Sequence, residues 1–368
     1  MKIKQIGEGR VIMSNPTSYF KYFAWPTVCR LKNGRLALGA SGYRLSHVCP
    51  FGKSVMSISE DEGESWTIPS PVIDTVLDDR DVGVAAFGES GLIFTSFNNT
   101  ADYQRSVIDK YKKGETEAAF RASYLDMVKK EDEDKYIGST FRISYDNGVT
   151  FGPIYKSPIT SPHGPTELSD GSVMWLGRTF DEREVNDRIE AHILDTKTGK
   201  MQLVGFIDDI EIDGKKVLAC EPHAVQTPSG RIICHVRIQS ENRMNGGKVF
   251  TIYQSVSDDL GKTWSKPVQI LGDKDGAPPH LMISSKGDII CVYARRDEPY
   301  SIKAMISRDD GESWESEPLI FNCPVKVPDH GYPATVELKD GSFLTVFYTR
   351  EEEGGPTVIW QQKWCIEE

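Results

Sequence analysis

The stretch "SRDDGESW", from Ser307 to Trp314, is one of four copies of the same eight-residue pattern. The other copies are "SEDEGESW" at 59–66, "SYDNGVTF" at 144–151 and "SDDLGKTW" at 257–264. The shared aspartate can accept hydrogen bonds from backbone N–H groups, the glycine permits positive φ, and the final aromatic ring can cover a hairpin. Because strand-like segments flank each copy, the pattern predicts a turn between two antiparallel strands.

A second repeat, of the kind "LKDGSFLTVFYTR", runs in phase with the first and predicts a strand, a tight turn and another strand. Its turn glycines are Gly34, Gly91, Gly171, Gly230, Gly287 and Gly341, at spacings of 57, 80, 59, 57 and 54 residues. The one long spacing contains a charged insertion, about residues 98–139, that is predicted to be helical.

Six such hairpins, four of them followed by a second hairpin at the aspartate turn, give units of four strands. Four-stranded units arranged radially form a β-propeller. We therefore predict an all-β fold in which residues 1–368 form a single six-bladed propeller of four-stranded antiparallel blades. The N-terminal strand, residues 2–13, is expected to complete blade 6, and the helical insertion in blade 2 is expected to lie beside the functional face.

The composition and net charge of the chain argue against several classes of binding partner. The chain has 368 residues, 39% of them hydrophobic, and a net charge of −11. This charge argues against nucleic acid or an anionic membrane as a partner, and no apolar run approaches the roughly 20 residues of a membrane span. The start, "MKIKQIGEGR", lacks the apolar stretch of a secretory signal, so we expect a cytoplasmic location. The sequence does not determine the oligomeric state, and a homo-oligomer is compatible with it.

The starts of the innermost strands and the ends of the next strands should meet at one face of the propeller. Histidines and arginines gather at these positions: His163, His223, His280, His330, Arg178, Arg237, Arg295, Arg296 and, slightly beyond its strand, Arg44. Converging guanidinium groups indicate an anionic ligand, because they match carboxylate or sulfate. We expect no cofactor, although several histidines at one mouth could bind a divalent ion.

The repeated aspartate turn, in this register, resembles the Asp-box (BNR repeat) of the sialidase (neuraminidase) superfamily, and the resemblance covers nearly the whole chain. It is a strong indicator of fold and a weak indicator of function. It implies that Tyr332, nine residues before Gly341, is a nucleophile and that Glu221, nine residues before Gly230, is its base. It further implies that Arg237 holds a sugar carboxylate and that Asp81 binds substrate.

Two positions differ from the sialidase pattern. Ala24 and Trp25 stand where the superfamily has Arg-Ile, so Trp25 could offer an apolar wall to a sugar instead of a charge. The loop that carries the superfamily's acid/base aspartate reads "SGYRLSHVCPFGK" here and contains no acidic residue. His47 or Arg44 could replace that aspartate, with His47 the expected general acid.

Three functions fit these residues. The first is an exo-acting glycoside hydrolase that uses the Tyr332 and Glu221 pair on an acidic or acyl-substituted sugar, with weak or no activity on simple sialosides. The second is a polysaccharide lyase for a uronate-containing glycan, in which arginine or a metal neutralises the carboxylate. The third is a non-catalytic glycan-binding propeller. In each case the partner is a carbohydrate, expected to be anionic, whose identity and linkage the sequence leaves open.

Overall fold

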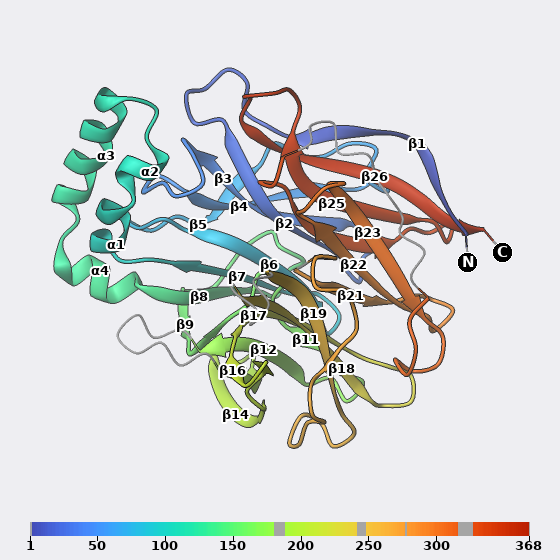
Figure 1. The fold of residues 1–368 in the computed structure, drawn as a ribbon. Helices are drawn as coiled ribbons and strands as arrows, with labels where there is room; N and C mark the ends of the chain where they lie inside the picture. Colours follow the sequence, from blue (N-terminus) through green and yellow to red (C-terminus); the bar gives the residue numbers. More distant parts are fainter. Residues whose placement is uncertain (1, 180–187, 241–247, 277, 316–326, 368) are drawn as a thin grey trace.

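Six antiparallel sheets are arranged around a common hub in the computed structural model, which describes residues 2–179, 188–240, 248–276, 278–315 and 327–367 (Figure 1). The predicted six-bladed β-propeller is confirmed. Three of its innermost strands, Tyr22–Arg30, Arg80–Phe87 and Gly331–Glu337, are almost wholly buried between neighbouring blades.

The strands follow one another blade by blade along the chain. Blade 1 consists of β2 (Tyr22–Arg30), β3 (Leu36–Arg44), β4 (Lys53–Ser59) and β5 (Ser70–Ile73). Blade 2 consists of β6 (Arg80–Phe87), β7 (Gly91–Asn98), β8 (Gly138–Ser144) and β9 (Tyr155–Ser157). Blade 3 consists of β10 (Ile159–Thr160), β11 (Thr166–Glu167), β12 (Val173–Thr179), β13 (Ile189–Asp195) and β14 (Lys200–Ile207).

A small two-stranded hairpin lies between blades 3 and 4 along the chain. It is formed by β15 (Glu211–Ile212) and β16 (Lys215–Lys216). Blade 4 consists of β17 (Leu218–Gln226), β18 (Ile232–Ser240), β19 (Val249–Ser257) and β20 (Val268–Gln269). Blade 5, within the described residues, consists of β21 (His280–Ile283), β22 (Ile289–Arg295) and β23 (Ser301–Ser307).

The N-terminal strand closes the ring, as predicted. Blade 6 consists of β24 (Gly331–Glu337), β25 (Phe343–Arg350), β26 (Thr357–Glu367) and β1 (Lys2–Met13). Strand β1 pairs antiparallel with β26 from Lys2 opposite Glu367 to Met13 opposite Ile359. The two ends of the chain therefore lie side by side at the rim of blade 6 (Figure 1).

The aspartate turns adopt the predicted hydrogen bonds. In the first copy, Asp61 accepts bonds from the backbone N–H of Ser65 at 2.8 Å and from its hydroxyl at 2.6 Å, and the hydroxyl of Ser59 accepts the N–H of Gly63 at 2.9 Å. The bonds from Ser65 lower the pKa of Asp61 to about 2. The ring of Trp66 reaches beyond its own hairpin and donates to Gln361 of blade 6 at 3.0 Å, so the turn also ties two blades together.

The insertion between β7 and β8 is helical and lies at one side of the propeller (Figure 1). It contains α1 (Ala101–Ser106), α2 (Ile108–Tyr111), α3 (Glu115–Met127) and α4 (Lys130–Tyr136). Both of its ends are held by Asn98, whose amide donates to the carbonyl of Tyr136 at 3.1 Å and accepts the N–H of Gly138 at 2.9 Å. In the described part of the chain, none of the helices has the length and apolar character needed to cross a bilayer.

Candidate active site

The same backbone distortion occurs at the start of the innermost strand in four blades. Trp25, Asp81, Glu221 and Tyr332 have φ values of 53°, 52°, 51° and 49°, and each lies at a register shift between its strand and the next. A left-handed conformation in a non-glycine residue costs on the order of 1–3 kcal/mol and tends to occur at functional sites. All four side chains line one cavity of about 350 Å³.

Tyr332 and Glu221, which the resemblance to sialidases assigns as nucleophile and base, are joined by a hydrogen bond. The phenol of Tyr332 donates to Oε1 of Glu221 at 2.5 Å, and Nη1 of Arg237 donates to Oε2 of Glu221 at 2.6 Å and to the phenol oxygen at 3.3 Å. Burial raises the pKa of Tyr332 well above its usual value, and the charges of Glu221 and Asp81 add to that rise. The phenol is therefore protonated at neutral pH, with a carboxylate in place to receive its proton.

Arg296 brings a positive charge to the same cavity. Its Nε donates to the carbonyl of His330 at 2.9 Å and its Nη2 to the phenol oxygen of Tyr348 at 3.1 Å, and both acceptors are neutral. The guanidinium lies 5.2 Å from the ring centre of Tyr332. Among the described residues, no carboxylate forms an ion pair with Arg296, so its charge remains available to a ligand. Arg178, at the end of β12, also lines the cavity.

Arg80 is a cavity residue that the sequence reasoning missed. Its guanidinium lies 4.3 Å from the ring of Trp25, 3.6 Å from Asp81 and 4.0 Å from Asp78, and its charge is buried. The available signal was its position directly before Asp81, at the predicted start of an innermost strand. Burial, more than any charge, raises the pKa of Asp81 to about 6, while Arg80 opposes that rise.

His47 lies at the edge of the cavity, in an aromatic setting. Its Nδ1 is 3.3 Å from the hydroxyl of Tyr22 and 3.5 Å from a carboxylate oxygen of Asp329. Its ring stacks on Tyr111 of the insertion, with centroids 5.6 Å apart, and meets Trp25 edge-on at 4.9 Å. Burial lowers the pKa of His47, and the hydrogen bond with Asp329 partly offsets this.

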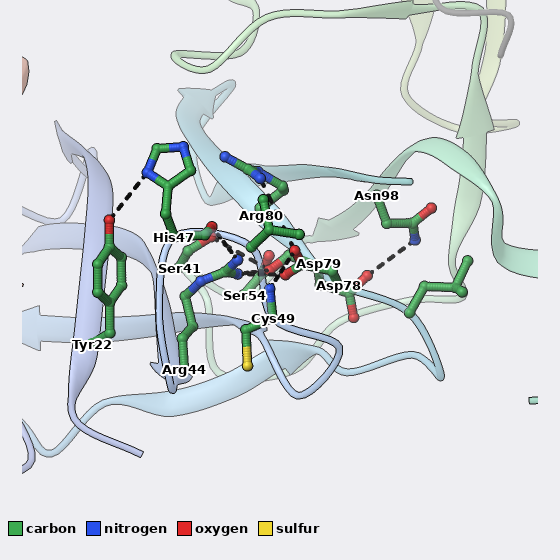
Figure 2. A network of polar contacts seen from close by, with 12 residues as sticks. Tyr22, Ser41, Arg44, His47, Cys49, Ser54, Asp78, Asp79, Arg80 and Asn98 are labelled. Carbon is green, nitrogen blue, oxygen red and sulfur yellow. Dashed lines mark hydrogen bonds and ion pairs between the residues drawn. The ribbon is translucent and has the colours of Figure 1, made fainter. Parts of the chain in front are cut away.

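Two buried arginines hold the loop that carries His47. Arg44 donates to the carbonyl of His47 at 2.8 Å and pairs with Asp78 at 2.6 Å, and Asp78 accepts the N–H of Cys49 at 3.0 Å (Figure 2). From the other side, Arg121 of α3 donates to the carbonyl of Val48 at 2.7 Å. The side chain of Arg44 thus lies beneath the loop rather than in the cavity, and its predicted contact with substrate has no support.

Several predicted substrate-binding residues lie elsewhere. Arg295 pairs with Asp275 at 2.6 Å, outside the residues that line the cavity. His330 is fully buried, with its Nδ1 2.5 Å from the carbonyl of Val327. Three further histidines line a separate cavity along the hub: His163, His223 and His280. In the described ranges, no group of three or more His, Cys, Asp or Glu side chains is placed to hold a metal ion, so the divalent-ion alternative gains no support.

The arrangement joins a hydrogen-bonded tyrosine and glutamate pair to a set of positive charges. Tyr332 and Glu221 form the pair, and four guanidinium groups line the same small cavity: Arg80, Arg178, Arg237 and Arg296. The same cavity is also lined by two acidic side chains, those of Asp81 and Glu221. The cavity is therefore suited to an anionic ligand and to chemistry at an atom near the phenol oxygen of Tyr332.

Comparison with known proteins agrees with this fold. A protein of unknown function from Dyadobacter fermentans superposes with a TM-score of 0.76 at 18% identity, covering 99% of each chain. An intramolecular trans-sialidase from Ruminococcus gnavus gives a TM-score of 0.64 at 12% identity over 97% of each chain. The α-L-arabinofuranosidase Arb93A from Fusarium graminearum gives 0.63 at 13% identity over 98% of each chain. At these identities the likeness shows the fold alone.

Curated protein sequences include no significant match to this chain. A family model does match it: residues 128–345 fit the model described as a BNR repeat-like domain. This match spans more than half of the chain and includes three of the four aspartate turns, so the sialidase-like propeller fold rests on sequence as well as on shape. The protein belongs to the family of BNR repeat-like domains.

Proposed function

We propose that this protein is an exo-acting glycosidase that removes a terminal sugar carrying an anionic group. The observation that carries the proposal is the 2.5 Å hydrogen bond between Tyr332 and Glu221 beneath the guanidinium groups of Arg237 and Arg296. A tyrosine nucleophile suits an anionic sugar, because a carboxylate nucleophile would be repelled by the negative charge of the substrate. A cavity of about 350 Å³ holds one sugar unit rather than a long chain.

The mechanism has two displacement steps. In the first, the phenol oxygen of Tyr332 attacks the anomeric carbon while its proton moves to Glu221, and protonated His47 gives a proton to the departing glycosidic oxygen. In the second, water attacks the anomeric carbon and gives its proton to neutral His47. As the new bond forms, the bond between the anomeric carbon and the phenol oxygen of Tyr332 breaks, and the phenolate recovers its proton from Glu221, so the enzyme returns to its starting state.

Arg80 supports an anionic substrate in the absence of the first-blade arginine. Its guanidinium lies beside Trp25, the residue after Ala24, and so adds positive charge at the side of the cavity where the sialidase pattern has its missing arginine. The charge enters from blade 2 rather than blade 1, so the ligand's anionic group should sit differently from that of a simple sialoside. Sialosides should accordingly be poor substrates, and another acidic sugar is preferred.

Two of the similar structures support glycosidase chemistry as a class. One is a trans-sialidase and the other an arabinofuranosidase, which share the propeller and act on different sugars. The lyase alternative draws less support, because the three histidines that would favour it line the hub rather than the cavity of Tyr332.

The test is covalent trapping. We would incubate the protein with fluorinated glycosyl fluorides of sialic acid, glucuronic acid and a neutral sugar, and identify the modified peptide by mass spectrometry. The proposal expects an acidic sugar attached to Tyr332. Tyr332→Phe should abolish both labelling and turnover while sparing ligand binding, because it removes one hydroxyl and keeps the ring.

Three outcomes would contradict the proposal. They are labelling of a carboxylate instead of Tyr332, residual turnover of Tyr332→Phe within a few-fold of the unchanged protein, or release of an unsaturated uronate from a polyuronate. The last product absorbs in the ultraviolet and would identify a lyase. Release of 4-methylumbelliferone from its sialic acid glycoside at ordinary rates, about 1–1000 per second, would contradict only the preference against sialosides.

A further inference from the structure

A second cavity, of about 790 Å³, follows the hub behind the candidate active site. Every blade contributes residues to it, and in the innermost strands they come after the residues of the active-site floor. Tyr332, for example, belongs to the floor, whereas the second cavity continues from Thr335 to the hairpin glycine Gly341. The cavity therefore opens toward the hairpin turns, at the face opposite the candidate active site.

The floor of this hub cavity is formed by three histidines in mutual contact. The rings of His223 and His280 are stacked with centroids 4.7 Å apart, and His163 meets His280 edge-on at 5.0 Å and His223 at 5.6 Å. All three are buried. Burial is the main cause that lowers the pKa of each of them, so the three rings are neutral at physiological pH.

Hydrogen bonds decide where His163 carries its proton. The hydroxyl of Thr27 donates to the carbonyl of Pro162 at 3.1 Å, which uses its only proton. Nδ1 of His163 lies 2.9 Å from the same hydroxyl and must therefore be the donor. Nε2 of His163 is then an acceptor, and in the described structure it is buried without any hydrogen-bond partner. Leaving a buried polar atom unpaired is costly, so this atom indicates a missing partner.

His223 and His280 have the opposite tautomer. Nδ1 of His223 accepts the backbone N–H of Leu281 at 2.9 Å, and Nδ1 of His280 accepts that of Thr335 at 3.3 Å. As neutral rings they carry their protons on Nε2. Both rings line the hub cavity together with His163, and within the described ranges neither Nε2 has a hydrogen-bond partner.

This pattern excludes a metal ion as the natural occupant. A histidine binds a metal through a nitrogen lone pair, and only Nε2 of His163 offers one here. A charged ligand is also disfavoured at the floor, because the rings are neutral and the ionic groups at the rim are already engaged. Arg30 pairs with Glu62 at 2.7 Å, and Glu337 accepts the N–H of Ser285 at 2.6 Å.

We propose that the hub cavity binds a neutral, hydroxyl-bearing molecule of about monosaccharide size. A hydroxyl group both donates and accepts, so it can give its proton to Nε2 of His163 and accept one from His223 or His280. Apolar side chains on the walls, such as Val28, Val225 and Leu281, would pack against the carbon skeleton. This site is separate from the proposed catalytic one and does not depend on it.

The experiment uses the full chain labelled with ¹⁵N-histidine and myo-inositol as the probe. Myo-inositol is a neutral cyclic polyol with no glycosidic bond, so the catalytic cavity cannot consume it. Long-range ¹H–¹⁵N spectra of the free protein should show the Nδ1–H tautomer for His163 and the Nε2–H tautomer for His223 and His280. Titration should then move the Nε2 signal of His163 saturably, with a Kd of about 1 mM or tighter.

Two variants locate the binding. His163→Leu removes the acceptor and should weaken myo-inositol binding at least about ten-fold, since a lost hydrogen bond costs about 1.4 kcal/mol or more. Tyr332→Phe keeps the ring that lies 6.4 Å from His163 and removes only a hydroxyl that faces the other cavity, so it should bind the probe as the unchanged protein does. A non-saturating response, equal binding by His163→Leu, or the reversed tautomers would overturn the proposal. The spectra of the unchanged protein decide the matter even if His163→Leu fails to fold.

Discussion

His47 is the residue whose protonation should set the pH dependence of the proposed reaction. Burial lowers its pKa below the usual value of 6.5, and a general acid must be protonated before it can act. The fraction of imidazolium falls as the pH rises through this lowered pKa. We therefore expect kcat/KM to be highest at acidic pH and to decline as the pH rises toward neutrality.

A substitution separates the acid role of His47 from a structural one. His47→Gln should lower kcat by about 10²–10⁴-fold on a glycan substrate, because the departing alcohol then leaves without a proton. On an aryl glycoside, whose leaving group needs no proton, the loss should be small, and the decline toward neutral pH should disappear. Equal losses on both substrates would show that His47 only supports the fold of the cavity.

Arg296 is expected to supply much of the affinity for an anionic ligand. It lies over Tyr332, its hydrogen bonds go to neutral acceptors, and its charge has no carboxylate partner among the described residues. Removing one charge-assisted contact costs about 1.5–3 kcal/mol. Arg296→Met should therefore weaken binding of an acidic sugar by roughly ten- to a hundred-fold, as measured by calorimetry.

The matched control for this substitution is Arg295→Met. Arg295 is adjacent in sequence, but it pairs with Asp275 outside the cavity. Its loss should leave affinity for the acidic sugar within about two-fold. If both variants bind equally well, the anionic group of the ligand does not contact Arg296.

The helical insertion contacts the loop that carries His47 through the buried side chain of Arg121. Arg121 of α3 pairs with Glu117 of the same helix, and two further hydrogen bonds from it reach the hydroxyl of Ser46 and the carbonyl of Val48, on either side of His47. Because Tyr111 of α2 also stacks on His47, the insertion forms one wall of the cavity and holds the loop that carries the proposed acid.

Arg121→Met should loosen this loop. It leaves Glu117 charged and buried, which typically costs about 3–5 kcal/mol, and it frees the backbone on both sides of His47. We expect a lower melting temperature, a shift of the His47 pKa toward 6.5 as the ring gains solvent, and a reduced kcat. NMR titration of the His47 ring measures the pKa shift directly.

Arg105→Met provides the comparison on the same insertion. Arg105 is half exposed and forms ion pairs with Asp102 and Asp126, well exposed residues of the helices themselves. This change should leave the His47 titration unchanged. An unaltered His47 pKa in Arg121→Met as well would mean that the loop keeps its shape without the insertion.

The propeller as a whole depends on closure by its first strand. Strand β1 covers the outer edge of β26 along almost its full length. Without it, β26 would present unpaired backbone groups beside apolar residues such as Ile359 and Trp364, and exposed edges of this kind promote association between chains. Deletion of residues 1–13 should therefore convert the protein to soluble aggregates, as seen by size-exclusion chromatography with light scattering.

A synthetic peptide of residues 2–13 tests whether edge pairing is the cause. Added in excess during refolding, it should restore the elution volume of the full-length chain, because it supplies the missing hydrogen bonds of blade 6. A deleted chain that behaves like the full-length protein without the peptide would show that closure by β1 is dispensable.

Most of the propeller fold could be predicted from the sequence because the same turn motifs recur in successive blades. The aspartate turns and the hairpin glycines recur at nearly constant spacing, and each copy specifies the same turn without reference to the rest of the chain. The resemblance to sialidases, applied at the positions nine residues before Gly341 and Gly230, identified Tyr332 and Glu221, which the structure places in hydrogen-bond contact. Their pairing across blades 4 and 6 follows from the equal geometry of the repeated units.

Which charged side chains reach the cavity was decided by the tertiary structure. Arg295 and Arg296 are neighbours in sequence, yet successive side chains along an extended chain point in opposite directions, and only Arg296 faces the ligand space. Arg80 enters the cavity because a register shift in β6 turns the chain there. Its neighbour Asp78, by contrast, is drawn into the buried network around Arg44 shown in Figure 2.

Three histidines that were predicted to bind substrate lie farther along the hub than the candidate active site. The sequence gives the order of residues along an innermost strand. It does not give the residue at which the candidate active site ends and the hub cavity begins. His163, His223 and His280 lie just past that division, so their rings face the hub cavity instead of the candidate active site. Turn and strand signals are local and can be counted along the chain, whereas the partition of space at the hub depends on how side chains from all six blades pack together.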